Sequence, residues 1–303
     1  MKMAKLIMPF STNRMKKPNL IAIVSLAVLV VAGALFYKYS TNVTNRYASL
    51  FPEQVASPAR AVTSPFIYNF TVDGTLAETG AMDESSSPYW WLNSGGRMYL
   101  KSGIGMTIQG ELPTSDKWRV LYNIDNPADT DLGFHPQNIF RLVTRSKWKS
   151  FSQQTSFQIV KNTLSASEER DAWSGILLFN RYQDGNNLYY TGIRDDGHAV
   201  IKSKKKGDYV TLAEKSYFPG TYDRAANPSL LPVGKWMAIK SEITTNSDNT
   251  VSIKLYVDND NSGKWTLALE AKDTKNPILN EGYAGIRTDF KDVQFDNFKI
   301  VNI

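Results

Sequence analysis

The sequence predicts an all-β protein made of two antiparallel sheets. The stretch Gly175–Leu212 contains four short runs rich in Ile, Leu, Val, Phe and Tyr, separated by QDGNN, DDG and KKGD. Strand-forming runs interrupted by Asp, Asn and Gly are typical of consecutive antiparallel hairpins, because Gly and Asn supply the positive φ of tight turns. Such a meander must bury one face, so a second sheet is expected to cover it.

The length and composition fit a large β domain. The 303 residues include 14 Phe, 15 Tyr and 7 Trp, which are ample for a core, and no Cys. Disulfides, thiolate metal sites and a cysteine nucleophile are therefore excluded. With only two histidines, His135 and His198, a three-histidine zinc site is excluded as well.

The net charge of +6 is concentrated at the N-terminus. Residues 1–47 contain seven cationic side chains and no acidic one, so residues 48–303 hold 28 cations against 29 anions. A nucleic-acid-binding domain should itself carry a basic surface. We therefore expect no nucleic-acid partner.

An N-terminal membrane segment is expected before the domain. The uncharged run Leu20–Tyr37 is 18 residues long, about the minimum for a hydrocarbon core of roughly 30 Å. More cations precede the run than follow it, which predicts a cytoplasmic basic segment (1–18), a transmembrane signal anchor (19–37) and an extracytoplasmic C-terminal part. The alternative is a secreted protein with a cleaved signal peptide, since Ala32-Gly33-Ala34 resembles a cleavage site.

Residues 38–64 are polar, contain proline and show no periodicity, which indicates a linker or stalk. The remaining residues, 65–303, are expected to form one β domain of about a dozen strands. Trp118–Ile124 is included among these strands, and only Thr163–Ala172 suggests a helical turn. So many strands exceed an immunoglobulin sandwich of ~100 residues, and the absence of a repeat argues against a propeller.

The strand order resembles the concanavalin A-like lectin/glucanase superfamily. The similarity rests on GILLFNRYQDGNNLYYTGIRDDGHAVIKSKKKGDYVTLAE, on Gly234-Lys235-Trp236 opening a strand, on VSIKLYVDND followed by GKWTLALE, and on GYAGIRTDFKDVQFDNFKI. Within the superfamily the chain looks most similar to laminin-G-like glycan-binding modules and jelly-roll polysaccharide lyases. The resemblance implies a jelly-roll β-sandwich that meets carbohydrate on its concave face or rim loops. The Glu-x-Asp-x-x-Glu strand of the superfamily's retaining glucanases is absent, which disfavours their chemistry.

Several cations and one tyrosine are expected to share strand faces. Residues two or four apart in a strand point the same way, which pairs Arg141 with Arg145, Tyr190 with Arg194, and Lys202 with Lys204. If these faces coincide, they form a basic groove suited to an acidic polysaccharide. The alternative is an ordinary solvated sheet face. The candidate ligand-binding residues are Arg141, Arg145, Arg181, Tyr190, Arg194, Lys202, Lys204, Arg287, Trp90 and Trp91.

The tryptophans offer a second route to glycans, through stacking on sugar rings. Trp90 and Trp91 are adjacent, so in a strand at most one of them joins the core. Trp118, Trp148 and Trp173 lie near charged residues at expected strand ends. Packing in a β-sandwich core is the alternative for each of them.

No cofactor is required, and a structural calcium ion is the one candidate. Asp258-Asn-Asp260-Asn-Ser262-Gly263 resembles the start of a calcium loop, but its flanks are strands, which favours a hairpin turn. Asp73 and Asp296 are further calcium candidates.

These patterns predict a membrane-anchored, extracytoplasmic, lectin-like domain that binds a polysaccharide. The first alternative is a lyase for acidic glycans, with Tyr190, Arg141, Arg145 and His198 as catalytic candidates and Arg181 and Arg194 in the groove. The second alternative is a structural or adhesion protein of the cell envelope. Whether the protein is an enzyme stays open at this point.

Overall fold

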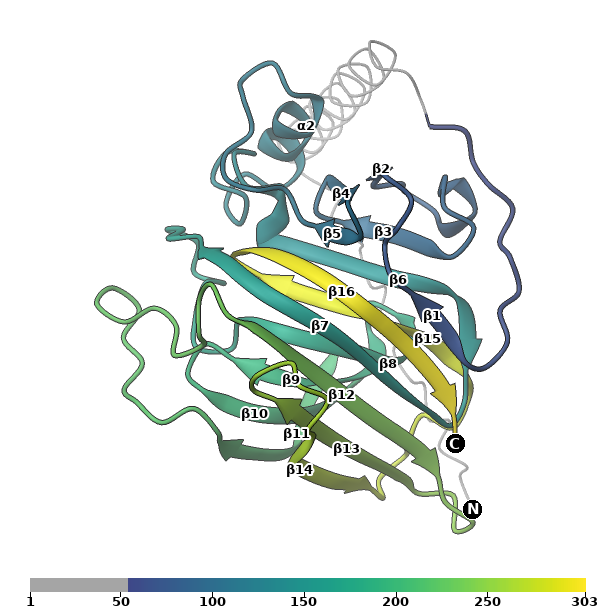
Figure 1. The fold of residues 1–303 in the computed structure, drawn as a ribbon. Helices are drawn as coiled ribbons and strands as arrows, with labels where there is room; N and C mark the ends of the chain where they lie inside the picture. Colours follow the sequence, from purple (N-terminus) through teal and green to yellow (C-terminus); the bar gives the residue numbers. More distant parts are fainter. Residues whose placement is uncertain (1–53) are drawn as a thin grey trace, which may run out of the picture. The chain divides into compact units, whose positions relative to one another are not determined.

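The computed structural model describes residues 54–303, in which sixteen strands form two antiparallel sheets packed as a jelly-roll-like β-sandwich (Figure 1). The nine-stranded sheet has the order β14-β13-β12-β7-β16-β5-β4-β2, and β1 also pairs with β16. Its strands are β1 (Phe66–Tyr68), β2 (Gly74–Ala77), β4 (Arg97–Lys101), β5 (Ile104–Met106), β7 (Phe151–Asn162), β12 (Trp236–Thr245), β13 (Val251–Asp258), β14 (Thr266–Asp273) and β16 (Lys291–Asn302).

The seven-stranded sheet has the order β11-β10-β9-β8-β15-β6-β3. Its strands are β3 (Trp90–Ser94), β6 (Ile139–Trp148), β8 (Gly175–Asp184), β9 (Asn187–Arg194), β10 (His198–Lys205), β11 (Asp208–Ser216) and β15 (Gly282–Asp289). The predicted meander is confirmed as the run β8 to β11, in which each strand pairs with the next. Gly197 (φ 79°) and Gly207 (φ 94°) supply the left-handed backbone at its last two turns.

The main core lies between the sheets. Phe140 on β6 stacks on Phe295 on β16 with ring centroids 5.8 Å apart, and both are fully buried. Strand β13 shows the alternation of a sheet with one buried face, because Val251, Ile253 and Leu255 are buried and the residues between them are half-buried. The apolar residues of the alternating pattern thus point between the two sheets and form the core.

The outer face of the seven-stranded sheet is also covered at its centre. Strand β8 is buried at every position from Gly175 to Tyr182, and β9 is buried from Leu188 to Arg194. A second apolar cluster lies on this face, with Val143, Leu177 and Phe179 among its members. The polar side chains that share this face therefore lie in partly desolvated surroundings.

The expected strand at Trp118–Ile124 is wrong, because these residues lie in helix α2 (Lys117–Asp125). The Asp116 side chain caps the helix by accepting a hydrogen bond from the backbone N–H of Trp118, and Trp118 and Tyr122 share its buried face. The suggested turn of helix at Thr163–Ala172 is an irregular loop. Two 3₁₀ turns complete the elements: η1 (Met82–Glu84) and η2 (Pro136–Asn138).

The predicted cytoplasmic segment and transmembrane anchor lie outside the described residues, as does most of the predicted linker. Within residues 54–303 the structure contains no helix long and apolar enough to cross a membrane. The described part of the expected linker runs along the domain, with the backbone N–H of Ser57 bonded to Ser85 and that of Arg60 to Pro88.

Candidate functional site

Four of the candidate residues meet on the outer face of the seven-stranded sheet. Arg141 on β6 lies directly opposite Arg287 on β15, and Tyr190 on β9 lies directly opposite Lys202 on β10. Their neighbours along the strands, such as Phe140 and Ile286, point into the core. Strand pairing therefore brings cations from separate parts of the sequence to one face.

This face is concave. Tyr209 on β11 and Arg287 on β15 are separated by three strands, and four strand spacings in a flat sheet would place them roughly 19 Å apart. Nevertheless, both side chains line the same pocket. The Tyr209 ring also lies 6.0 Å from that of Tyr190. The sheet therefore curves around this face.

A pocket of about 250 Å³ opens on the concave face. Five sheet residues and one loop segment line it: Leu177, Tyr190, Lys202, Tyr209 and Arg287 from the sheet, and Glu169, Asp171, Trp173 and Ser174 from the loop between β7 and β8. The pocket combines two carboxylates, an ammonium, a guanidinium, two phenols and an indole. Such a mixture of apolar surface and a few convergent polar groups is typical of a small-molecule site.

Trp173 is 47% exposed, and of the aromatic residues in the pocket only Tyr209 is more exposed. Lys202 Nζ lies 3.2 Å from the centroid of its ring, and Arg194 Cζ lies 4.0 Å away. The backbone is also fixed, because Asp171 accepts a hydrogen bond from the N–H of Trp173 and the carbonyl of Ser174 accepts one from Asp195. The indole is thus held in one position while half of it faces solvent.

The cation Arg194 is neutralised by its own neighbours. Its guanidinium donates to both carboxylate oxygens of Asp196 and to both oxygens of Glu214. Asp196, His198 and Glu214 are the only group of three or more potential metal ligands found in residues 54–303. A metal ion there would have to displace the guanidinium, so these residues fit a structural ion-pair network better than a cation site.

Lys202 and Tyr190 have shifted pKa values because they are buried. Burial, reinforced by the nearby charge of Arg194, lowers the pKa of Lys202 to about 8. Burial raises the pKa of the Tyr190 phenol, which therefore stays protonated at neutral pH. Lys202 can consequently exchange a proton near neutral pH, and Tyr190 can donate a hydrogen bond.

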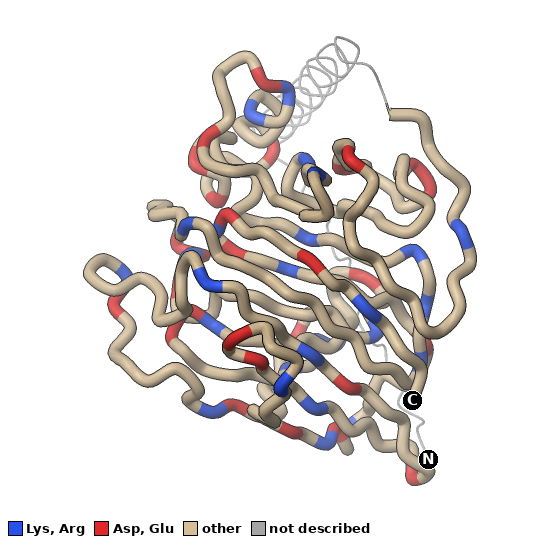
Figure 2. The backbone as a smooth tube through the Cα atoms, in the orientation of Figure 1, with Lys and Arg blue, Asp and Glu red and all other residues tan. Residues whose placement is uncertain are grey.

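Positions of Lys and Arg are interspersed with positions of Asp and Glu along both sheets, as Figure 2 shows for the described residues. On the concave face, arginines and carboxylates lie side by side. The carboxylate of Asp289 accepts a hydrogen bond of 2.8 Å from Arg287 Nε, which outweighs the effect of burial and raises the pKa of Arg287. Arg141, beside this pair, has no ion-pair partner among the described residues.

Three of the candidate residues serve the fold. Arg145 Nη1 donates to the backbone carbonyls of Ser57 and Ser87, and it thereby fixes the segment before β1. Arg181 is fully buried, and it donates to backbone and hydroxyl oxygens of three other segments. Trp90 is 1% exposed in the core. None of the three side chains reaches the concave pocket.

Trp91, Lys204 and His198 lie at the margins of the concave face. Trp91 is half-buried, and its indole N–H donates to the carbonyl of Thr79. Lys204 Nζ lies 4.6 Å from the ring centroid of Tyr209. His198 lies beside Asp196, in the network around Arg194.

The four calcium candidates do not come together. Asp258 accepts hydrogen bonds from the backbone N–H groups of Asp260 and Gly263, as expected for a hairpin turn. Asp260 forms an ion pair with Lys235. Asp73 accepts from the backbone of Ser102, and Asp296 from the backbone of Asn297. Each carboxylate stabilises a local turn.

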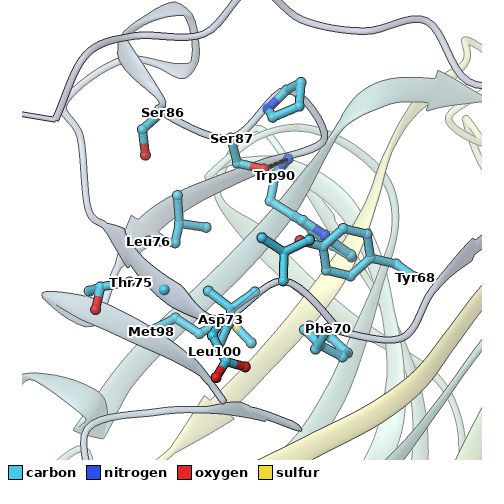
Figure 3. Close-up of a pocket in the computed structure, with 13 residues that line it drawn as sticks. Tyr68, Phe70, Asp73, Thr75, Leu76, Ser86, Ser87, Trp90, Met98 and Leu100 are labelled. Atoms are coloured by element: carbon cyan, nitrogen blue, oxygen red, sulfur yellow. Dashed lines mark hydrogen bonds between the residues drawn. The ribbon is translucent and has the colours of Figure 1, made fainter. Parts of the chain in front are cut away.

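Figure 3 shows a second hollow, of about 200 Å³, between the rings of Tyr68, Phe70 and Trp90 and the side chains of Leu76, Met98 and Leu100. Its lining is mainly apolar and offers few groups for hydroxyls. A third hollow, of about 290 Å³, lies on the nine-stranded sheet and includes Trp265 and Lys299. The concave pocket is lined by four charged side chains, against two in the third hollow and one in the second.

Sequence reasoning did not assign Glu169, Asp171 or Tyr209 to the site, and it noted Trp173 only as lying near a strand end. Glu169 and Asp171 lie within Thr163–Ala172, where the sequence suggests a helical turn, and Trp173 follows directly after that segment. The available signal was the pattern Asp171-Ala-Trp173-Ser174 immediately before a buried strand. A large aromatic residue in a polar loop beside a strand end indicates exposure.

No protein-family model and no curated protein matches the chain. Among solved structures, the chain is similar to the carbohydrate-binding module CBM66 from Bacillus subtilis (15% identity, 55% of this chain and 83% of that one, TM-score 0.40). It is also similar to the GH43 protein BlXynB from Bacillus licheniformis (14% identity, 81% of this chain but 41% of that one, TM-score 0.44).

A third similar structure is a β-1,3-1,4-glucanase (lichenase) derived from a mouse hindgut metagenome (13% identity, 80% of this chain and 100% of that one, TM-score 0.43). The identities and TM-scores limit the similarity to general architecture.

Proposed function

We propose that residues 65–303 form a lectin-like carbohydrate-binding domain whose site is the concave pocket beside Trp173. The observation that carries the proposal is the half-exposed indole of Trp173, fixed by Lys202 and Arg194 at the edge of a pocket rich in hydrogen-bonding groups. The C–H groups on one face of a sugar ring are attracted to the negative face of an aromatic ring. The ring hydroxyls both donate and accept hydrogen bonds.

The polar groups of the pocket suit those hydroxyls. Glu169 and Asp171 accept hydrogen bonds, Lys202 and Arg287 donate them, and Tyr190 and Tyr209 do both. The indole is already held in place before a ligand arrives, so less side-chain freedom is lost on binding. A pocket of about 250 Å³ accommodates roughly one sugar unit at a time.

The proposal extends to location. The uncharged run at residues 20–37 and the preceding basic segment favour an anchor that displays the domain outside the cell membrane. Labelling of the protein on intact cells by a protease or a membrane-impermeant reagent tests this part. Failure to label it in cells with an intact membrane would contradict an extracytoplasmic domain.

The binding test uses the full chain in detergent on a glycan array, followed by titration calorimetry with the best ligand. We expect Trp173→Ala to weaken binding by about 10-fold or more, the usual effect of removing an aromatic anchor. Trp265→Ala is the matched control, because Trp265 is also a tryptophan beside a lysine, Lys240, but lies just before β14 of the other sheet. Loss of binding in the control and not in Trp173→Ala would place the site elsewhere.

A lyase for acidic glycans is the second candidate, favoured by one observation. Lys202 has a pKa lowered to about 8 and lies opposite Tyr190 in the sheet, so the amine can accept a proton at mildly alkaline pH. The raised pKa of Tyr190 disfavours the phenol as the base. Incubation with alginate, pectin and glycosaminoglycans should produce ultraviolet absorbance from new C=C bonds if the protein is a lyase.

A further inference from the structure

Arg141 has no hydrogen-bond or ion-pair partner among residues 54–303. Every other arginine in residues 54–303 donates at least one hydrogen bond to a carboxylate, hydroxyl or backbone carbonyl. The structure contains no hydrogen bond or ion pair from Arg141 to any described residue. The Arg141 side chain is half-buried, and partial desolvation of its charge costs free energy. None of its five N–H donors is used by a described residue.

The neighbours of Arg141 increase this cost. Arg287 lies directly opposite on β15, and like charges in opposed positions of a sheet destabilise it. Burial, followed by Arg287, lowers the pKa of Arg141, while Asp289 acts in the opposite direction. Asp289 is bonded to Arg287, and Arg141 has no ion-pair partner of its own among the described residues.

The position of Arg141 connects this charge to the pocket. Arg287 lines the pocket, and Arg141 is its neighbour on the next strand of the same concave face. An anionic group beside Arg141 and Arg287 would accept hydrogen bonds from the free donors of Arg141 and offset the repulsion between the two guanidinium groups.

We infer that the carbohydrate ligand carries an anionic group, a carboxylate or a sulfate, and that this group binds at Arg141 and Arg287. The inference rests on the proposed function, since it names the class of sugar that the pocket takes. Arg141 supplies a planar pair of N–H donors, and the carboxylate and the sulfate both offer matching pairs of oxygens. Trp173 and Lys202 then contact the remainder of the sugar unit or its neighbour.

The test compares matched ligands on the full chain in detergent. Uronate oligosaccharides are titrated beside the same oligosaccharides with their carboxyl groups reduced to alcohols, and sulfated oligosaccharides form a third arm. We expect the wild type to bind one of the charged forms at least 10-fold more tightly than the reduced form. The preferred arm distinguishes the carboxylate from the sulfate. Equal affinity for charged and reduced sugars would overturn the inference.

Substitutions of Arg141 test whether this residue causes the preference for the charged sugar. Arg141→Gln should abolish the preference for the charged sugar, with a loss of about 10- to 100-fold in its affinity, while affinity for the reduced sugar stays within 2- to 3-fold. Arg141→Lys should keep part of the preference. Lys272→Gln removes the same charge from the exposed edge strand β14 of the other sheet, so it should leave the preference intact. A preference that persists in Arg141→Gln would overturn the assignment.

A measurement with inorganic sulfate tests the anion site independently of carbohydrate binding. Inorganic sulfate at matched ionic strength should raise the melting temperature of the wild type more than that of Arg141→Gln. If no glycan binds but this difference is observed, the proposed carbohydrate function fails and the anion site stands. If glycans bind through Trp173 but sulfate and charge have no effect, the carbohydrate function stands and the anion site fails.

Discussion

Lys202 Nζ lies 3.2 Å from the centroid of the Trp173 ring, and this contact joins the loop before β8 to the concave face of the seven-stranded sheet. The lysine comes from β10 and is only 7% exposed. The contact therefore places an ammonium in a desolvated position, where the ring face supplies part of its solvation. It also fixes the half-exposed indole that we propose as the sugar platform.

The first prediction concerns the pH dependence that Lys202 gives to stability. Its pKa is about 8 in the folded protein against 10.5 in the unfolded chain, so the unfolded chain binds more protons between these values. Stability should therefore rise as the pH increases from about 8 to about 10.5, by on the order of 1–3 kcal/mol. Urea unfolding of wild type and Lys202→Met across this range measures it. An equally steep rise in Lys202→Met would show that another group is responsible.

The second prediction concerns Glu78. Its carboxylate accepts hydrogen bonds from Tyr122 (2.5 Å) and from the backbone of Gly96 (2.7 Å), but burial raises its pKa from 4.5 to about 7. The folded state holds this proton more tightly, so the stabilisation is complete below about pH 4.5 and is lost as the pH rises to about 7. Glu78→Gln should flatten this fall in denaturant titrations. A variant that retains the full fall would contradict the prediction.

The third prediction concerns the buried ion pair between Lys291 and Asp195. Lys291 Nζ lies 2.6 and 2.7 Å from the two carboxylate oxygens, and the side chains are 1% and 4% exposed. Lys291→Met should lower the free energy of unfolding by about 3–5 kcal/mol, because it leaves a buried charge unpaired.

Chemical denaturation measures the loss at Lys291. The double variant Lys291→Met, Asp195→Asn is the control, since it removes both charges and should recover part of the lost stability. Asp195 also donates its backbone N–H to Ser174, beside Trp173. If the double variant is no more stable than the single one, the loss is due to packing and not to charge.

The fourth prediction concerns Gly192, which lies between Tyr190 and Arg194 on β9. A Cβ atom at Gly192 would lie 2.1 Å from the backbone oxygen of Ile176 and 2.8 Å from Leu177 Cα, so Gly192→Ala must shift two strands. We expect a loss of about 1–3 kcal/mol in the free energy of unfolding. Gly185→Ala is the matched control, because its Cβ would have no neighbour within 4 Å. Thermal or urea unfolding compares them, and similar stability of the two variants would refute the account.

The meander from β8 to β11 was predictable because its information is local. Each hairpin is determined by strand formers and by Asn, Asp and Gly at its turns, all within a few residues. The same local reading failed for Lys117–Asp125. There Trp118 and Tyr122 fit a strand by composition, but the Asp116 cap and their spacing of four residues support a helix.

The sequence by itself determined the all-β class, the hairpin order and a near-neutral domain after a basic leader. Only the tertiary structure decided which cations share a surface. Arg141 and Arg145 are four residues apart on one strand, yet Arg145 binds backbone carbonyls while Arg141 lies unpaired beside Arg287. The reason is that pairing of β6 with β15 and the curvature of the sheet join residues distant in the chain, and no local pattern of side chains encodes those contacts.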